Sequence, residues 1–298
     1  MYYSYKVYGI CIHSNIRLPE LSPSNDIADL TIQIDREGDK VKHICQQPSV
    51  ISGRLEGVGT FYIQQGKTVV IDPHTHDMDM LRPAILGGIL AAALRQRGML
   101  VLHASCVNIE NQAIAFMGDS GWGKSTLAAA FHHQGNSILT DDVMAIQFDE
   151  LMPFVVPGFP QIKLWPDAAD AFGHKPGQLP SLYSNAPKLS YCFDQGFQQE
   201  PLPLTRLYVL RKGAQDGPLC EIKPLTHQSA FLELVKHTRE MIGMSSADIR
   251  EAHFHQCTAL LQSVKVSYLI RRPQLNNLAD VVEHIKHHVL AQPEAIAP

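Results

Sequence analysis

Apolar runs and their spacing divide the chain of 298 residues into a strand-rich first part and a longer region in which strands and helices alternate. In the first part, short apolar or alternating runs at 5–12, 28–34, 59–63 and 68–72 predict strands, and the last two, joined through Gly66, predict a hairpin. The chain is therefore predicted to be an α/β protein with a small β-rich N-terminal domain, residues 1–80, and a larger domain, residues 81–298. The first domain carries no catalytic constellation, and we expect it to serve in substrate presentation or self-association.

The larger domain contains further strand and helix patterns and one long irregular stretch. Strands are predicted at 99–109, 113–117, 137–140, 143–148, 207–210 and 264–270, and helices at 83–97, 167–172, 228–239, 247–262 and 278–290. Prolines and glycines stiffen a predicted loop at 157–167 and recur through 173–188, a composition that is typical of lids and substrate loops. The tail, 291–298, is predicted to fray.

One segment between a predicted strand and a predicted helix carries a specific chemical signal. Residues 118–125 read Gly-Asp-Ser-Gly-Trp-Gly-Lys-Ser, which fits the P-loop pattern GxxxxGK[ST]. Glycines let backbone N–H groups curl round phosphate oxygens, and the helix N-terminus adds a positive potential. The pattern predicts a nucleoside triphosphate site, against the alternative of a chance glycine-rich turn.

The residues of this P-loop are predicted to bind ATP together with Mg²⁺. The predicted nucleotide-binding residues are Gly118, Asp119, Ser120, Gly121, Trp122, Gly123, Lys124, Ser125 and Thr126. Lys124 is expected to reach the β- and γ-phosphates, and the Ser125 hydroxyl is expected to ligate Mg²⁺. Trp122, and Trp165 in the proline-rich loop, fit contacts with nucleotide or substrate as well as plain loop packing.

Two acidic residues, Asp141 and Asp142, end the strand that follows the P-loop helix. Two carboxylates at the end of an apolar strand cost free energy unless they face a cation. A strand-terminal acid at this distance from a P-loop is the expected second anchor for Mg²⁺. His103 interrupts the apolar strand before the P-loop strand, and taken alone it fits a core histidine bonded to a backbone carbonyl.

His103, the P-loop and the aspartate pair together resemble the bacterial HPr kinase/phosphorylase superfamily. His103 lies 21 residues before Lys124, Asp141 lies 17 after it, and the P-loop reads GDSGxGKS, as in that family. Two further patterns are similar to those of short HPr-kinase-like proteins, of which the lasso-peptide precursor kinases are the nearest match. These patterns are Tyr5, Tyr8 and Gly9 followed by Leu18-Pro19-Glu20-Leu21, and the stretch from Gly158 to Asp167.

The resemblance implies a role for each of these residues. Asp142 is the base that accepts the proton of the substrate hydroxyl, Asp141 holds Mg²⁺ with Ser125, and His103 orients the base, although the two aspartates are open to exchange. The Pro-Gly-Arg-Asn segment that supplies a catalytic arginine in HPr kinases is not found here. The candidates for the cation that replaces it are Lys163, Lys188, Arg206 and Arg239, among which Lys188, at the end of the irregular stretch, is named as catalytic.

Composition restricts the partners and the location. The net charge is −4, and the sequence has no basic block of the kind that binds nucleic acid. It has no apolar window long enough to span a bilayer and no signal-peptide pattern, and its six cysteines show no paired spacing. We therefore expect a cytoplasmic protein without nucleic-acid or membrane partners, and homo-oligomer formation is left open.

The expected function is ATP-dependent transfer of the γ-phosphate to a serine hydroxyl of a peptide or protein. The resemblance makes the C-terminal serine of a lasso-peptide precursor the specific expectation. Two alternatives stay open: a small-molecule kinase, for example one that acts on free serine, and a nucleotide-dependent sensor without phosphoryl transfer. The pair Asp141 and Asp142 favours a kinase, because a sensor does not need it. The acceptor, a reverse phosphorylase reaction and the oligomeric state are not determined by the sequence.

Overall fold

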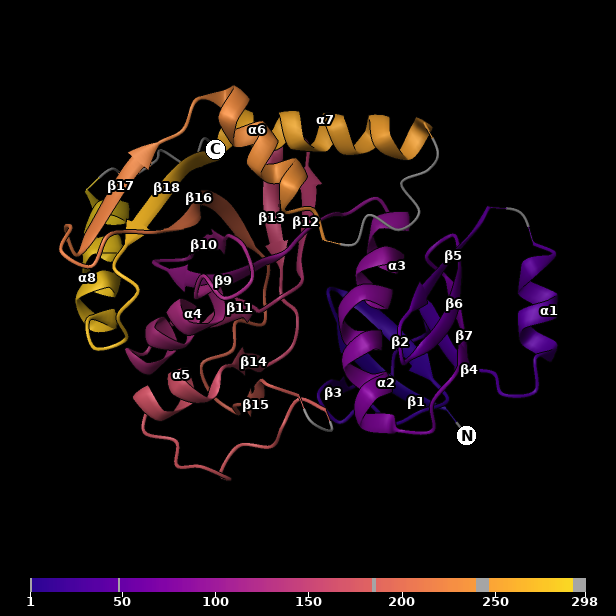
Figure 1. Ribbon diagram of the computed structural model, residues 1–298. Coiled ribbons are helices and arrows are strands. Elements are labelled where there is room, and N and C mark those ends of the chain that lie inside the picture. The colour runs from indigo at the N-terminus through magenta and orange to yellow at the C-terminus, as the bar shows by residue number, and fades with distance from the viewer. Residues whose placement is uncertain (1, 48, 184–185, 240–246, 292–298) are drawn as a thin grey trace.

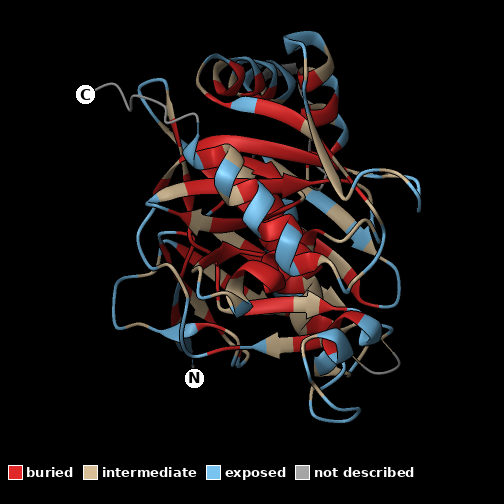
Figure 2. Ribbon diagram, turned by 90° about the vertical axis from the view of Figure 1, so that its left-hand side faces the viewer, coloured by how far each residue is buried: buried red, intermediate tan, exposed pale blue. Residues whose placement is uncertain are grey.

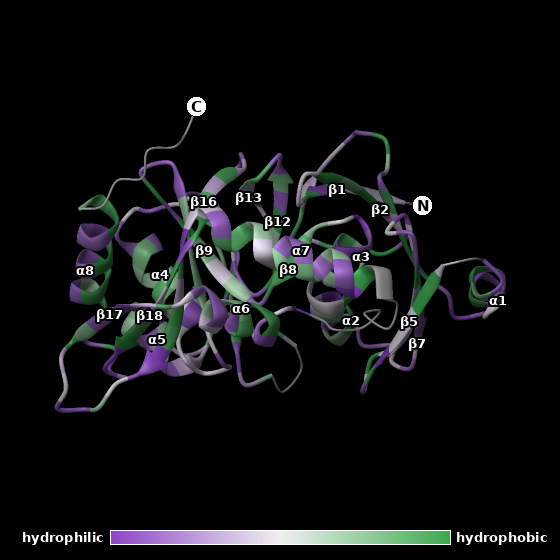
Figure 3. Ribbon diagram, turned by 90° about the horizontal axis from the view of Figure 1, so that it is seen from above, coloured by the Kyte–Doolittle hydropathy of each residue, from purple (hydrophilic) through white to green (hydrophobic). Residues whose placement is uncertain are grey.

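The computed structural model describes residues 2–47, 49–183, 186–239 and 247–291 and confirms a mixed α/β fold that is built on several sheets (Figure 1). Two halves lie side by side, with the N-terminal half on the right of Figure 1. The same division is visible from above, where α1 (Asp39–Cys45) and α8 (Leu278–Leu290) lie at opposite ends of the molecule (Figure 3). None of the described helices combines the length and the apolar composition needed to cross a membrane.

The N-terminal half is a seven-stranded sheet in the order β3-β1-β2-β4-β7-β6-β5. Its strands are β1 (Tyr3–Val7), β2 (Ile10–Ser14), β3 (Ser22–Pro23), β4 (Leu30–Ile34), β5 (Val50–Leu55), β6 (Gly59–Gln64) and β7 (Thr68–Pro73). The hairpin predicted at 59–72 is confirmed as β6 and β7. The prediction of one strand at 5–12 is wrong, because Tyr8 and Gly9 both have positive φ, 50° and 69°, and reverse the chain into the β1–β2 hairpin.

A continuous helical segment packs on this sheet. It consists of α2 (Met78–Ala84), one π-helical stretch, η1 (Ile85–Ile89), and α3 (Leu90–Gln96). The segment begins before the predicted start beside Pro83, because the Asp77 carboxylate accepts the Asp79 N–H at 2.8 Å and caps the helix there. Its buried side chains share a core with the sheet and with residues of the second half, Val143 and Val156 among them. The division at residue 80 stays a prediction.

The second half is built on a nine-stranded sheet with the main order β11-β9-β10-β16-β13-β12-β8. Its strands are β8 (Leu100–Leu102), β9 (Ala104–Ile109), β10 (Gln112–Met117), β11 (Ile138–Thr140), β12 (Met144–Asp149), β13 (Met152–Val156), β16 (Leu202–Lys212), β17 (Cys220–Pro224) and β18 (Lys265–Arg271). The strands β10, β16 and β18 are parallel neighbours, and β17 pairs with β18. Because parallel strands end at the same edge, loops that follow β10, β16 and β18 gather there.

Helices cover both faces of this second sheet. They are α4 (Lys124–His133), α5 (Pro166–Ala171), α6 (His227–Lys236), α7 (Ala247–Ser263) and α8. Alternate residues of β10 point to opposite faces of the sheet. On one face Ile114 and Phe116 pack with α4 and α8, and on the other face Ala115 and Met117 pack with α6 and α7. Figure 2 shows the resulting buried strands between helices with exposed outer faces.

The loop predicted at 157–167 contains a strand instead. A separate two-stranded sheet is formed by β14 (Gln161–Leu164) and β15 (Leu189–Cys192). The strands β13 and β17 were also not predicted, because both are short and lack a clear alternating pattern. The helix predicted at 228–239 ends at Lys236, because the backbone of Thr238 bridges to Leu102 of β8. Apart from Ala291, the predicted frayed tail lies outside the described residues.

Candidate active site

The P-loop connects the end of β10 directly to the start of α4, as the sequence predicts. Gly121 and Gly123 have φ values of 77° and 90°, which side-chain-bearing residues rarely adopt. A Cβ atom on Gly123 would lie 2.2 Å from the end of the Arg271 side chain, which would have to move, so the positive φ is the stronger reason for glycine there. The loop therefore ends at the N-terminus of a ten-residue helix, where the helix dipole and unpaired N–H groups attract anions.

Lys124 folds back onto the P-loop. Its Nζ donates a hydrogen bond to the carbonyl oxygen of Gly118 at 2.8 Å, and the residue is only 7% exposed. Burial lowers the pKa of the Lys124 ammonium to about 8, although Asp141 and Asp142 oppose this effect. A partly desolvated ammonium that has only carbonyl partners gains much from an incoming phosphate group.

The Asp119 side chain turns from the P-loop to α6. Its carboxylate forms an ion pair with Lys236 at 2.8 Å, just where α6 ends. This pair is the main reason why the pKa of the Asp119 carboxyl is lowered. The side chain therefore ties the P-loop to α6, and the nucleotide contact of Asp119 stays a prediction for its backbone.

His103 and Asp142 lie close together because each lies in a break between two consecutive strands, and the two breaks are neighbours in the second sheet. The chain breaks between β8 and β9 at His103, and between β11 and β12 at a short turn, residues 140–143, which we call the aspartate loop. The pairs Leu102↔Met144 and Cys106↔Thr140 lie on either side of the two breaks. Asp142 makes its turn with a φ of 74°, a conformation that Asp and Asn tolerate better than most residues.

The Asp142 carboxylate is surrounded by three cationic or proton-donating side chains. His103 Nδ1 lies 3.0 Å from Oδ1, whereas Lys163 Nζ and Arg239 Nη2 lie 2.6 Å and 3.3 Å from Oδ2. Burial raises the pKa of the Asp142 carboxyl, but Lys163, His103 and Arg239 outweigh it and hold the pKa well below its usual range. The carboxylate is therefore fully ionised and strongly paired in this structure.

The Asp141 carboxylate points into the protein, where hydrogen bonds link its own loop to β9 and β14. Ser105 Oγ donates to one carboxylate oxygen at 2.6 Å, and the Lys163 N–H donates to the other at 2.9 Å. The residue is 5% exposed and does not line the P-loop cavity. Asp142 is therefore the member of the pair that lines the P-loop cavity, although the Asp141 carboxylate exerts the largest charge effect on Lys124, and the Mg²⁺ role of Asp141 stays a prediction.

The P-loop, His103, Asp142 and two lysines line one narrow cavity of about 30 Å³. Its lining residues are His103, Ser120, Gly121, Gly123, Lys124, Ser125, Thr126, Asp142, Lys163, Trp165 and Lys188. Lys163 and Lys188 belong to this lining, Lys163 paired with Asp142 and Lys188 above the Trp165 ring.

A second cavity, of about 170 Å³, adjoins the P-loop on its other side. It is lined by Trp122, Arg211, Arg271 and Leu275, among others, and Trp165 borders both cavities. The Arg211 guanidinium lies over the Trp122 ring, 5.0 Å from its centroid. Aromatic and apolar walls with stacked arginines suit a flat, electron-rich ring.

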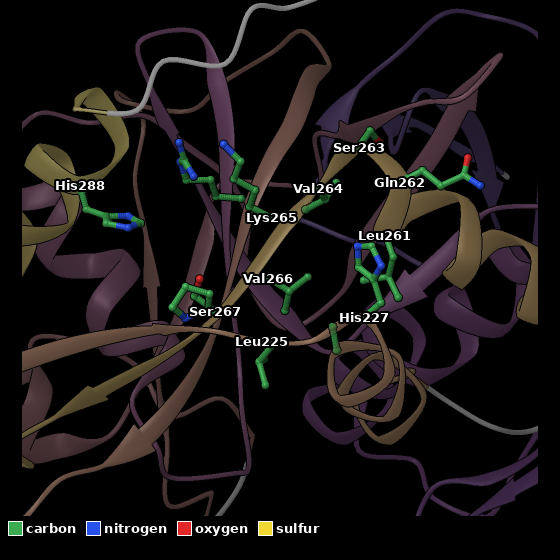
Figure 4. Close-up of a pocket in the computed structure, with 13 residues that line it drawn as sticks. Leu225, His227, Leu261, Gln262, Ser263, Val264, Lys265, Val266, Ser267 and His288 are labelled. Atoms are coloured by element: carbon green, nitrogen blue, oxygen red, sulfur yellow. The ribbon is translucent and has the colours of Figure 1, made fainter.

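Three of the four candidate cations reach the site. Lys163 and Arg239 contact Asp142, and Lys188 lines the cavity while it lies over Trp165, 5.6 Å from the ring centroid. Arg206 does not reach it: this residue, 2% exposed, lines a larger cavity of about 670 Å³ near the start of β16 and β18. Figure 4 shows that cavity, with Lys265 of β18, His227 of α6 and His288 of α8 on its walls.

The sequence contains a weak signal for the strand that carries Lys163, where only a loop was predicted. Gln161, Ile162, Lys163 and Leu164 alternate polar and apolar between two prolines, which is the pattern of a short strand. No comparable signal marks Arg239. It is positioned by a long-range bond from its N–H to the carbonyl oxygen of Val101, at 2.9 Å.

Comparisons with known proteins give little guidance. No protein-family model matches the sequence, and no curated protein matches it. Among solved structures, the Hpr(Ser) kinase/phosphatase from Coxiella burnetii is similar over 64% of this chain and 97% of its own, with 13% sequence identity and a TM-score of 0.35. A similarity at this level carries no argument about function, which is therefore argued from the site.

Proposed function

We propose that the protein is an ATP-dependent kinase that transfers the γ-phosphate to a serine hydroxyl of a peptide or protein. One observation carries the proposal: Asp142, paired with His103, faces the same cavity as Lys124 and Ser125 of the P-loop. A carboxylate beside a phosphate-binding loop is placed to accept a proton from the group that attacks the phosphate. A sensor needs the P-loop alone.

The residues of the two cavities fit ATP and Mg²⁺. The P-loop suits the phosphates, and the second cavity, with Trp122 and Arg211, suits the base. The Ser125 hydroxyl offers an oxygen ligand, and Mg²⁺ in such sites takes few protein ligands besides phosphates and water. When bound, Mg²⁺ neutralises charge on the phosphate oxygens.

In this mechanism Lys163 controls the pKa of Asp142 and also stabilises the transferring phosphoryl group. A carboxylate that is paired with Lys163 and Arg239 is a weak base, because its pKa is low. Phosphate oxygens compete for the same cations, so we propose that the bound donor draws Lys163 away and thereby raises the pKa of Asp142. Asp142 then accepts the hydroxyl proton, the serine oxygen bonds to the γ-phosphorus, and ADP leaves as the bridging P–O bond breaks.

Replacing Lys163 by methionine is expected to lower kcat about 100-fold, because the charge that stabilises the transferring phosphoryl group is lost while the aliphatic stem stays. Lys188→Met is expected to cost about tenfold or less, because Lys188 does not contact Asp142. Lys175→Met, an exposed lysine in the same irregular stretch, is the control and is expected to change nothing. Steady-state kinetics with saturating ATP measures the three effects. A larger loss for Lys188→Met than for Lys163→Met would reverse the assignment.

ATP binding is expected to weaken as the pH rises above about 8. Lys124 has a pKa of about 8 in this structure, and an adjacent triphosphate raises it, so binding above that pH takes up a proton. At pH 6 to 7, Lys124 is charged with or without nucleotide and adds no pH dependence. Isothermal titration calorimetry at pH 8.5 in buffers with different ionisation enthalpies measures the uptake. Equal observed enthalpies in all buffers would show that Lys124 keeps its proton.

The acceptor class is tested with one peptide in two forms. A precursor-type peptide that ends in serine is compared with its alanine-ending version and with free serine, using ATP labelled in the γ-phosphate. Label on the terminal serine alone is the expected result, as the resemblance to precursor kinases implies. Label on free serine but not on the peptide would instead indicate a small-molecule kinase. Bound ATP without transfer to any hydroxyl would indicate a sensor.

A further inference from the structure

A side chain at the tip of the β1–β2 hairpin, Tyr8, joins the N-terminal half to the aspartate loop. Tyr8 and Gly9 form this two-residue turn, and both have positive φ. Such turns favour Asn-Gly, because a bulky residue with positive φ is strained. A tyrosine in this place needs a compensating contact from its side chain, and the structure provides one.

Tyr8 is 1% exposed, and its hydroxyl contacts the first and the last residue of the aspartate loop. Its hydroxyl donates to the carbonyl oxygen of Val143 at 2.9 Å and lies 3.4 Å from the hydroxyl of Thr140. Thr140 donates to the same Val143 oxygen at 2.6 Å. Burial raises the pKa of the Tyr8 phenol, so the hydroxyl stays protonated and remains a donor. The two donors together close the turn that carries Asp142.

The same tyrosine also contacts the segment that leads to Lys163. Its N–H donates to the carbonyl oxygen of Pro157 at 3.0 Å. At Gly158, an added Cβ atom would lie 2.8 Å from the Thr140 hydroxyl and 3.0 Å from the Tyr8 hydroxyl, so the Gly158 backbone packs closely against these two side chains. From this junction the chain runs into β14, which carries Lys163. The two segments that carry Asp142 and Lys163 are therefore both in contact with Tyr8.

A second element of the N-terminal core approaches the same place. Gly87 of η1 is buried, and a Cβ atom there would lie 3.9 Å from Asp142 Oδ2 and 3.4 Å from Arg239 Nη2. Gly87 of η1 therefore lies beside the Asp142 side chain, and a side chain at this position would contact Asp142 and Arg239. This agrees with the shared core that joins the N-terminal sheet to Val143 and Val156.

We propose that Tyr8 is a positioning residue for phosphoryl transfer: its hydroxyl holds the aspartate loop so that Asp142 and Lys163 face the P-loop. The inference rests on the proposed kinase function. It gives the N-terminal half a part in catalysis, in addition to the expected substrate presentation. Tyr8 touches none of the residues of the P-loop cavity through its hydroxyl, so it acts on rate through Asp142 and not on nucleotide binding.

The test compares the loss of the hydroxyl group at two buried tyrosines, Tyr8 and Tyr5. Tyr8→Phe keeps the ring and removes only the hydroxyl, and Tyr5→Phe does the same to a buried tyrosine of the same sheet, whose hydroxyl accepts the Leu18 N–H at 2.9 Å. Both lose a buried hydrogen bond, so both are expected to unfold at a lower temperature. Tyr8→Phe alone is expected to lower kcat about tenfold at 25 °C, with the Kd for ATP unchanged within about twofold.

A second single variant, Thr140→Val, keeps the test decisive if Tyr8→Phe folds poorly. Thr140→Val removes the other donor to the Val143 carbonyl, and the double variant Tyr8→Phe/Thr140→Val is expected to lose more kcat than the product of the two single losses, because the buried oxygen then has no donor from either side chain. If Tyr8→Phe does not fold, a wild-type kcat for Thr140→Val overturns the proposal. Wild-type kcat for Tyr8→Phe, or an equal loss for Tyr5→Phe, also overturns it. No transfer by the wild-type protein would overturn the kinase function and this role together.

Discussion

Asp142→Asn is expected to lower kcat by about 10²- to 10⁴-fold while the Kd for ATP stays within about threefold, because the substitution removes a general base and nothing from the P-loop. Asparagine has the same shape and tolerates the φ of 74° at this position, so the aspartate loop keeps its turn. Single-turnover kinetics together with titration calorimetry separates the two quantities.

The matched control is Asp35→Asn in the N-terminal half. Asp35 is also a buried carboxylate, with its oxygens bonded to the N–H groups of Gly38 and Val41 at 3.2 Å and 2.8 Å. Its amide variant is expected to lose stability but no kcat. Near-normal transfer by Asp142→Asn, with the control behaving as expected, would remove Asp142 as the base.

Lys124→Met is expected to weaken ATP binding at least about 100-fold, since the ammonium that faces the phosphates is lost. Thermal unfolding of the nucleotide-free protein is expected to stay the same or to move to a higher temperature. The lowered pKa shows that the buried Lys124 ammonium costs free energy of folding, and methionine removes this cost. We expect the ammonium to be stabilised only when ATP binds. Calorimetric scans without and with ATP measure both effects.

Lys175→Met serves again as the control, because this lysine is exposed and does not line either cavity at the P-loop. It is expected to bind ATP like the wild-type protein. Wild-type ATP affinity of Lys124→Met would mean that nucleotide does not bind at the P-loop. A large loss of stability would mean that Lys124 supports the fold instead of the ligand.

Local patterns in the sequence predicted the parts of the site that depend on neighbouring residues. The strand, P-loop and helix at 113–131 were predicted because the glycines and Lys124 follow one another in a fixed order. The meeting of His103 with Asp142 was predicted from family spacing, and its physical cause is the pair of strand breaks that only the sheet pairing reveals. The different surroundings of Asp141 and Asp142 were beyond prediction, because the order of two adjacent residues does not say which side chain faces the cavity.

Contacts between distant segments were not predictable from one sequence. Lys163 lies on a four-residue strand whose partner, β15, follows only after the irregular stretch, and Arg239 depends on a bond to Val101. Tyr8 was noted only as part of a family pattern, because an apolar run at 5–12 predicts a strand and hides the turn. In each case the side chain is placed by tertiary packing that overrides the local signal.

The central claim is that a donor phosphate held by the P-loop passes directly to a hydroxyl activated at Asp142. A single-turnover experiment tests it most directly: enzyme in excess over γ-labelled ATP is mixed with a serine-ending peptide, and the label is followed in peptide and in inorganic phosphate. The account predicts that label moves from ATP to the serine in the wild-type protein and stays in ATP for Asp142→Asn. Release of label only as inorganic phosphate, at the same rate in both proteins, would contradict it.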